Sequence, residues 1–110
     1  MRDRLRAEFQ AQLGPGRVLL GPVAATPAFR HGERAWDVGG TRVSYLDSMR
    51  YSQWFNLLGA PAVVVPVGQS GDGLPIGVQV AGRPFDDALV LDVAGLIERE
   101  CGGYRPPPGY

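Results

Sequence analysis

The sequence contains no lysine, and all eleven of its basic residues are arginine. This excludes Schiff-base chemistry on lysine, a phosphate-binding loop of the GK[ST] type and a lysine general base. Histidine and cysteine occur once each, as His31 and Cys101. Together these absences remove most of the side chains that enzymes use as bases and nucleophiles.

Net charge and long apolar runs are also missing. Eleven basic and eleven acidic residues cancel, which leaves no electrostatic case for binding nucleic acid or an anionic membrane. The longest apolar run, residues 60–67, is too short to cross a bilayer, and the N-terminal residues lack the apolar stretch of a secretory signal. A lone cysteine forms no internal disulfide and fits a reducing compartment, so cytoplasm is the expected location.

Helical and strand patterns alternate along the 110 residues and predict an α/β arrangement. Ser44 and Asp47 form a capping-box pattern, which predicts a helix from Tyr45 that stops at Gly59. The other predicted elements are a helix over 2–13, a strand over 17–21, a long loop over 23–43 with a hairpin around 37–40, a central strand over 62–67, a glycine-rich turn over 69–73, a second strand over 76–81, a helix capped by Asp86 or Asp87 that runs to Arg99, and an extended PPPGY tail.

The two strands after residue 60 are apolar at nearly every position. Residues 62–65 read Ala-Val-Val-Val, and residues 76–81 read Ile-Gly-Val-Gln-Val-Ala. Such strands are typical of a sheet that is covered on both faces. Because so short a chain can barely cover a two-sided sheet, we expect another polypeptide segment, or a second copy, to supply more structure.

Several motifs resemble the C-terminal region of the amidase signature family in their order and spacing. They are NLLGAP at 56–61, VVVPVG at 63–68, GLPIGVQ at 73–79, GRP at 82–84, and upstream VLLGP at 18–22. The resemblance covers nearly the whole chain and implies the C-terminal part of an amidase-like α/β fold, with a short mixed sheet and flanking helices. Residues 1–110 would then form a single partial domain.

Members of this family hydrolyse carboxamides or transfer their nitrogen, using a nucleophilic serine, a second serine in a cis peptide and a lysine base. None of these residues has a counterpart here, since the chain lacks both the lysine and the glycine- and serine-rich stretch that carries the serines. The resemblance therefore implies no catalytic residue, cofactor or metal in this chain. The loop after residue 22 corresponds to one that approaches the substrate pocket, so Thr26, Phe29 and Trp54 are predicted pocket-wall residues.

The remaining candidates have ordinary structural interpretations. Ser70 lies in GQSGD, which departs from G-x-S-x-G and falls in a strand-to-strand turn. His31 has no second ligand-type neighbour, Cys101 sits at a helix end that disfavours a thiolate, and the Asp86–Asp87 pair is a helix cap.

The sequence thus favours the C-terminal portion of an amidase-like hydrolase, inactive by itself, whose substrate is a small-molecule amide and whose catalytic segment is elsewhere. Two alternatives remain open: a non-catalytic module that self-associates, and a remnant that binds small molecules. Neither nucleic acid nor a membrane is an expected partner.

Overall fold

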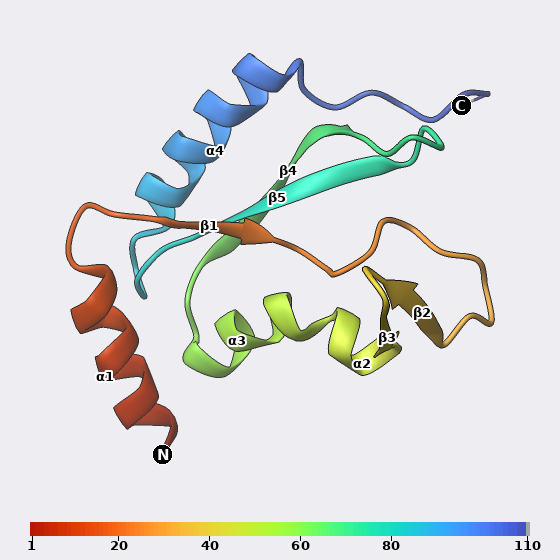
Figure 1. The fold of residues 1–110 in the computed structure, drawn as a ribbon. Coiled ribbons are helices and arrows are strands. Elements are labelled where there is room, and N and C mark those ends of the chain that lie inside the picture. Colours follow the sequence, from red (N-terminus) through yellow and green to blue (C-terminus); the bar gives the residue numbers. More distant parts are fainter. Residues whose placement is uncertain (110) are drawn as a thin grey trace.

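The computed structural model describes residues 1–109, which form helices and two small antiparallel sheets (Figure 1). The elements, in chain order, are α1 (Arg2–Leu13), β1 (Leu19–Pro22), β2 (Ala35–Val38), β3 (Thr41–Ser44), α2 (Tyr45–Ser48), α3 (Arg50–Leu58), β4 (Ala62–Gln69), β5 (Pro75–Ala81) and α4 (Asp87–Cys101). The predicted α/β class with flanking helices is confirmed. The last residue of the predicted tail, Tyr110, lies outside the described residues. Among those described, no helix is long and apolar enough to cross a membrane.

The main sheet has the strand order β1-β5-β4. Both pairings are antiparallel, with Ala81 of β5 opposite Leu19 on one side and Ala62 on the other. The sheet is therefore not mixed, and its central strand is β5 rather than the predicted residues 62–67. The apolar pattern indicated that both faces of these strands are buried, but it did not indicate which strands pair with one another.

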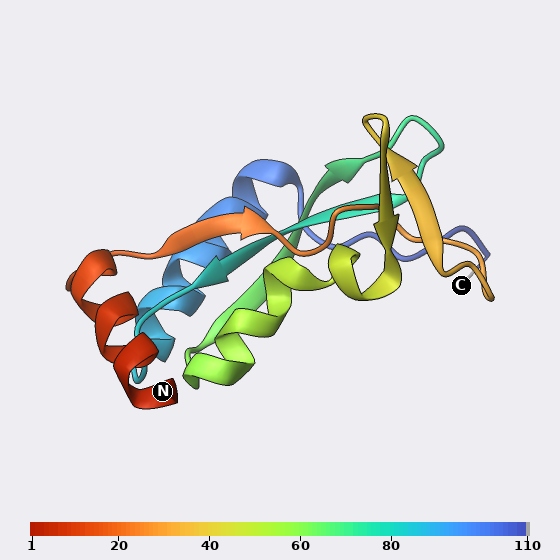
Figure 2. The same ribbon diagram turned by 60° about the horizontal axis from the view of Figure 1, so that its bottom comes forward.

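Consecutive residues of β5 face opposite layers of the fold. Val80 is completely buried and packs with Val65, Val90 and Ala94 in the core between the sheet and α4. The side chain of Gln79 points the other way and bonds to the backbone of α3. The turned view shows α1 and α3 next to each other on the side of the sheet away from α4 (Figure 2).

The predicted helix over residues 45–58 is interrupted at Met49. Its start is confirmed, because the Ser44 side chain accepts a hydrogen bond from the Asp47 N–H at 3.2 Å. Its end is confirmed as well, since Gly59 adopts a left-handed conformation with φ of 61°. Between them, the hydroxyls of Ser48 and Ser52 donate to the carbonyls of Tyr45 and Met49. Such local bonds compete with helical hydrogen bonding, so α2 and α3 form as separate short helices.

The predicted hairpin is also confirmed. Strands β2 and β3 pair from Ala35–Ser44 to Val38–Thr41, and Gly39 and Gly40 form the connection between them. Both glycines have positive φ, 57° and 82°, which a two-residue hairpin turn of type I′ requires.

Much apolar surface stays uncovered within residues 1–109. Val64 on β4 is 50% exposed, and Trp54 on α3 is 52% exposed. In the helices α2 and α3 the apolar surface points partly outward, because Phe55 and Leu58 are buried whereas Leu46 and Leu57 are exposed. This exposure agrees with the expectation that further polypeptide covers the fold.

Gly82, which directly follows β5, is a position where a larger side chain would collide with its neighbours. A Cβ there would lie 2.5 Å from Val90 Cγ2 and 3.4 Å from Asp86 Cβ. We expect Gly82→Ala to lower the free energy of unfolding by about 1–3 kcal/mol through overpacking. Gly71→Ala is the matched control, because nothing lies within 4 Å of a Cβ there and its φ is not positive. Urea unfolding measures both, and equal stabilities would contradict this packing.

Candidate functional site

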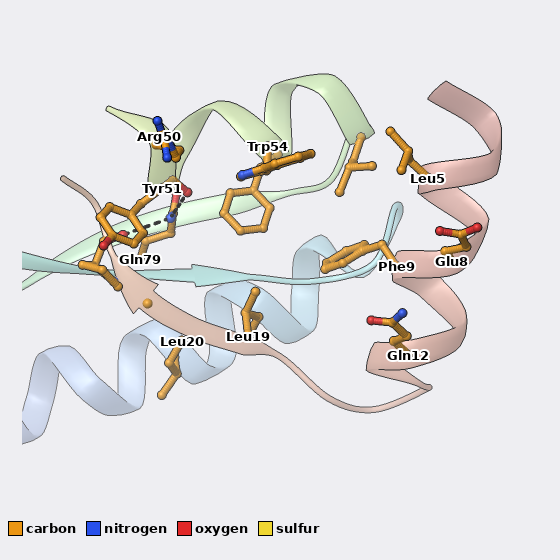
Figure 3. A pocket seen from close by; sticks show the side chains of 14 residues that line it. Leu5, Glu8, Phe9, Gln12, Leu19, Leu20, Arg50, Tyr51, Trp54 and Gln79 are labelled. Atoms are coloured by element: carbon orange, nitrogen blue, oxygen red, sulfur yellow. Dashed lines mark hydrogen bonds between the residues drawn. The ribbon is translucent and has the colours of Figure 1, made fainter. Parts of the chain in front are cut away.

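Two open cavities of similar size lie on the face of the sheet opposite α4. The first, of about 470 Å³, lies between α1, β1 and α3 (Figure 3). The second, also about 470 Å³, lies between residues 22–29, Met49 and the strands β4 and β5. These are the places where the described chain could form part of a binding site.

The first cavity has a mainly apolar lining. Leu5 and Phe9 come from α1, Leu19 and Leu20 from β1, and Trp54 from α3 (Figure 3). The rings of Phe9 and Phe55 pack edge to face, with 6.3 Å between their centroids, and so join α1 to α3. The polar residues of the lining are Glu8, Gln12, Arg50 and Gln79.

Gln79 holds the base of the first cavity together. Its side chain is only 5% exposed. The amide Nε2 donates to the Tyr51 carbonyl of α3 at 3.1 Å and to the Pro22 carbonyl of β1 at 3.4 Å. One side chain therefore connects the central strand, an edge strand and a helix, and the buried amide is satisfied by backbone.

The second cavity is bounded by the loop before the hairpin. Thr26 and Phe29 line it together with Met49, Val64 and Ile76. The Phe29 ring is fixed by aromatic neighbours, with its centroid 4.4 Å from that of Trp36 and 6.0 Å from that of Tyr45. The Thr26 hydroxyl oxygen is shielded from solvent and has no hydrogen-bond partner within the described residues.

The three predicted pocket-wall residues do not share one cavity. Thr26 and Phe29 line the second cavity, whereas Trp54 lines the first. Their role in substrate binding stays a prediction. Gln79 was not among the residues predicted from the sequence, where its only signal is an amide within an otherwise apolar strand.

The other candidates occupy structural positions. Ser70 lies in the β4–β5 turn, where its hydroxyl oxygen accepts from the Leu74 N–H at 3.2 Å. His31 and Cys101 are exposed, and residues 1–109 contain no group of three potential metal-ligating side chains. The predicted cap is confirmed in position, because Asp86 is the N-cap residue of α4. Its carboxylate makes no capping hydrogen bond, however, and accepts from Arg83 Nε at 3.0 Å instead.

Asp47, which lines a third and smaller cavity of about 350 Å³, has a shifted pKa. The Ser44 hydroxyl donates to Asp47 Oδ2 at 2.7 Å and, together with the nearby Arg50 guanidinium, lowers the pKa of Asp47 below 3.8. The shift reflects the geometry of the α2 N-terminus, where a carboxylate is also favoured by the helix dipole. It creates no group poised to exchange protons near neutral pH.

The sequence of this chain is similar to those of known amidases and amidotransferases. The Amidase family model matches residues 1–91. Over 109 residues the chain is 36% identical to a glutamyl-tRNA(Gln) amidotransferase subunit from Anaeromyxobacter sp. (strain K), covering 98% of this chain and 21% of that protein. A fatty acid amide hydrolase of Medicago truncatula is 50% identical over 60 residues, covering 54% of this chain and 10% of that protein.

The fold has solved counterparts as well. The crystal structure of an amidase matches with a TM-score of 0.83 and 30% identity, over 92% of this chain and 23% of that one. This chain therefore spans about a fifth of the length of the amidotransferase protein that it matches.

The Gln79 amide predicts a measurable stability effect. We expect Gln79→Leu to lower the free energy of unfolding by about 1–3 kcal/mol, because two partly buried carbonyls lose their donor. Gln12→Leu, at an exposed position lining the same cavity, is the control and should change stability little. Denaturant unfolding of both variants tests this, and a neutral Gln79→Leu would show that the amide does not hold the layers together.

The Ser44–Asp47 pair predicts a pH dependence. Because the folded-state pKa of Asp47 is lowered, its contribution is fully present above the unfolded value near 3.8 and is lost as pH falls through the lower folded value. We expect Ser44→Ala to raise the Asp47 pKa toward 3.8, since the hydroxyl is the largest cause of the shift. Carboxyl-carbon NMR titration measures both values; an unchanged pKa in the variant would refute the assignment.

Proposed function

The chain belongs to the amidase family, and from that premise we propose that it is the C-terminal, non-catalytic portion of an amidase-like hydrolase. The complete protein would hydrolyse the C–N bond of a carboxamide and release ammonia or an amine. The observation that carries the proposal is the coverage: nearly the whole chain matches an amidotransferase protein, yet it spans 21% of that protein.

The side chains of this chain also support a non-catalytic role for it within a larger amidase. Amide hydrolysis by a serine needs a nucleophile and a base within hydrogen-bonding reach of each other. In residues 1–109 neither cavity is lined by serine, cysteine or histidine, and the chain has no lysine. The nucleophile and the base would therefore come from another part of the enzyme.

The contribution of this chain is then a supporting layer and part of the substrate enclosure. Thr26 and Phe29 would form one section of pocket wall, and Trp54 another. Apolar walls determine which amide is accepted but do not break its bond. The exposed lone thiol of Cys101 favours a reducing, cytoplasmic location.

A second candidate function is self-association as an independent module. It is favoured by the exposed apolar side chains on both sides of the sheet, including Leu20, Trp54 and Val64. It differs from the first proposal in its partner, which would be another copy of the chain.

Co-expression with a truncated relative tests the proposal. The partner is the Anaeromyxobacter amidotransferase protein without the segment that matches this chain, and the assay measures ammonia release from simple carboxamides. We expect the purified chain to be inactive, and the co-expressed pair to co-purify and hydrolyse amides. The intact Anaeromyxobacter protein is the positive control.

Other outcomes separate the alternatives. Amide hydrolysis by the chain itself at an enzyme-like rate would contradict the absence of catalytic groups. A symmetric dimer in light scattering, without capture of the truncated relative, would favour the self-associating module.

A further inference from the structure

Phe85 combines two features that are unfavourable in the chain by itself. Its φ is 73°, and it is the only non-glycine residue with positive φ among residues 1–109. Its side chain is 93% exposed. A bulky residue in the left-handed region is strained, and an exposed aromatic ring has no contact that offsets the strain.

The strain arises from a tight turn between β5 and α4. The Asp86 N–H donates to the Arg83 carbonyl at 3.0 Å, so residues 83–86 form a four-residue turn with Pro84 second and Phe85 third. Proline at the second position and positive φ at the third are features of a type II turn. Glycine is the usual third residue of such a turn, so phenylalanine there indicates a role for the ring.

The turn is held firmly on both sides of Phe85. Gly82 is buried and its N–H donates to the Pro61 carbonyl at 3.0 Å. Pro84 is also buried, and the Arg83–Asp86 ion pair closes the turn at 3.0 Å. This framework fixes the backbone of Phe85 and leaves its side chain projecting outward.

We propose that Phe85 is an aromatic anchor by which this chain docks against the catalytic portion of the amidase. This inference rests on the proposed function. A rigidly presented aromatic side chain is the type of residue that dominates the binding energy of an interface when a pocket of the partner encloses it. Phe85 lines neither cavity, so it forms no part of the predicted pocket wall.

The choice of partner follows from the comparisons. Residues 1–91 match the amidase family, so the turn belongs to the part of the chain that is shared with amidases. In the Anaeromyxobacter amidotransferase protein the matching segment is 21% of the length. The other four fifths or so are the polypeptide against which an exposed anchor of this segment would pack.

Phe85→Gly and Phe85→Ala test the anchor in two settings. In the isolated chain, Phe85→Gly should raise the urea midpoint, because glycine relieves the strain and almost no contact is lost. With the co-expressed catalytic portion, both variants should bind at least tenfold more weakly than the unmodified chain and restore correspondingly less amide hydrolysis. The same loss in association from two substitutions with different backbone effects would assign it to the ring.

Tyr104→Ala is the matched control. Tyr104 is another exposed aromatic residue, 73% exposed, but it has no positive φ and lies outside residues 1–91, which the family model matches. It should leave both the urea midpoint and the association unchanged.

A full-length chimaera, in which this chain replaces the matching segment of the Anaeromyxobacter protein, provides a second measurement that does not require the truncated relative to fold separately. Phe85→Ala should lower its thermal midpoint, whereas Tyr104→Ala should not.

The possible failures are distinguishable. If the unmodified chain neither associates with the catalytic portion nor yields an active chimaera, the proposed function fails and the anchor with it. If it does both and the Phe85 variants behave like the unmodified chain, only the anchor is refuted. A lowered urea midpoint in Phe85→Gly, or a self-dimer that Phe85→Ala dissociates, would also overturn it, since the ring would then pack within the chain or against another copy.

Discussion

The whole arrangement depends on β5 being paired on both edges and packed on both faces. Its backbone bonds to β1 and β4, Val80 packs under α4, and the Gln79 amide reaches the backbone of α3. Because consecutive residues of a strand face opposite sides, two neighbouring side chains serve two different layers. The helices on either side are positioned through this strand, and so are the cavities that they line.

The outer strands lack the same support. Both β1 and β4 have only β5 as a neighbour within the described residues, and apolar side chains such as Leu20 and Val64 remain exposed. Exposed strand edges and apolar patches favour association with further polypeptide. The physical incompleteness of the fold and its coverage of about a fifth of a relative therefore point in the same direction. Both observations support the proposal that this chain completes the structure of a larger protein.

Prediction from sequence succeeded where the signal is local. The Ser44 cap, the Gly59 stop and the Gly39–Gly40 turn involve residues only a few positions apart, and the structure contains all three. It was less successful where partners are distant. The helix break at Met49 results from hydroxyl–carbonyl bonds that competed with a continuous apolar pattern. The candidate pocket wall separated into two cavities, because Trp54 lines the space between α1, β1 and α3, whereas Thr26 and Phe29 line the space beside Val64 and the start of β5.

The sequence by itself determined the family resemblance, the order of the helices and strands, and the absence of a lysine base, since these depend on residue identity and short spacings. Tertiary structure alone decided that β5 is the central strand, that Gln79 links three elements, and that Phe85 is both strained and exposed. Apart from the strain of Phe85, which comes from its own turn, these properties depend on contacts between residues far apart in the chain, or on the lack of such contacts. A periodic pattern shows that a side chain is apolar, but only the packed fold shows whether it has a neighbour.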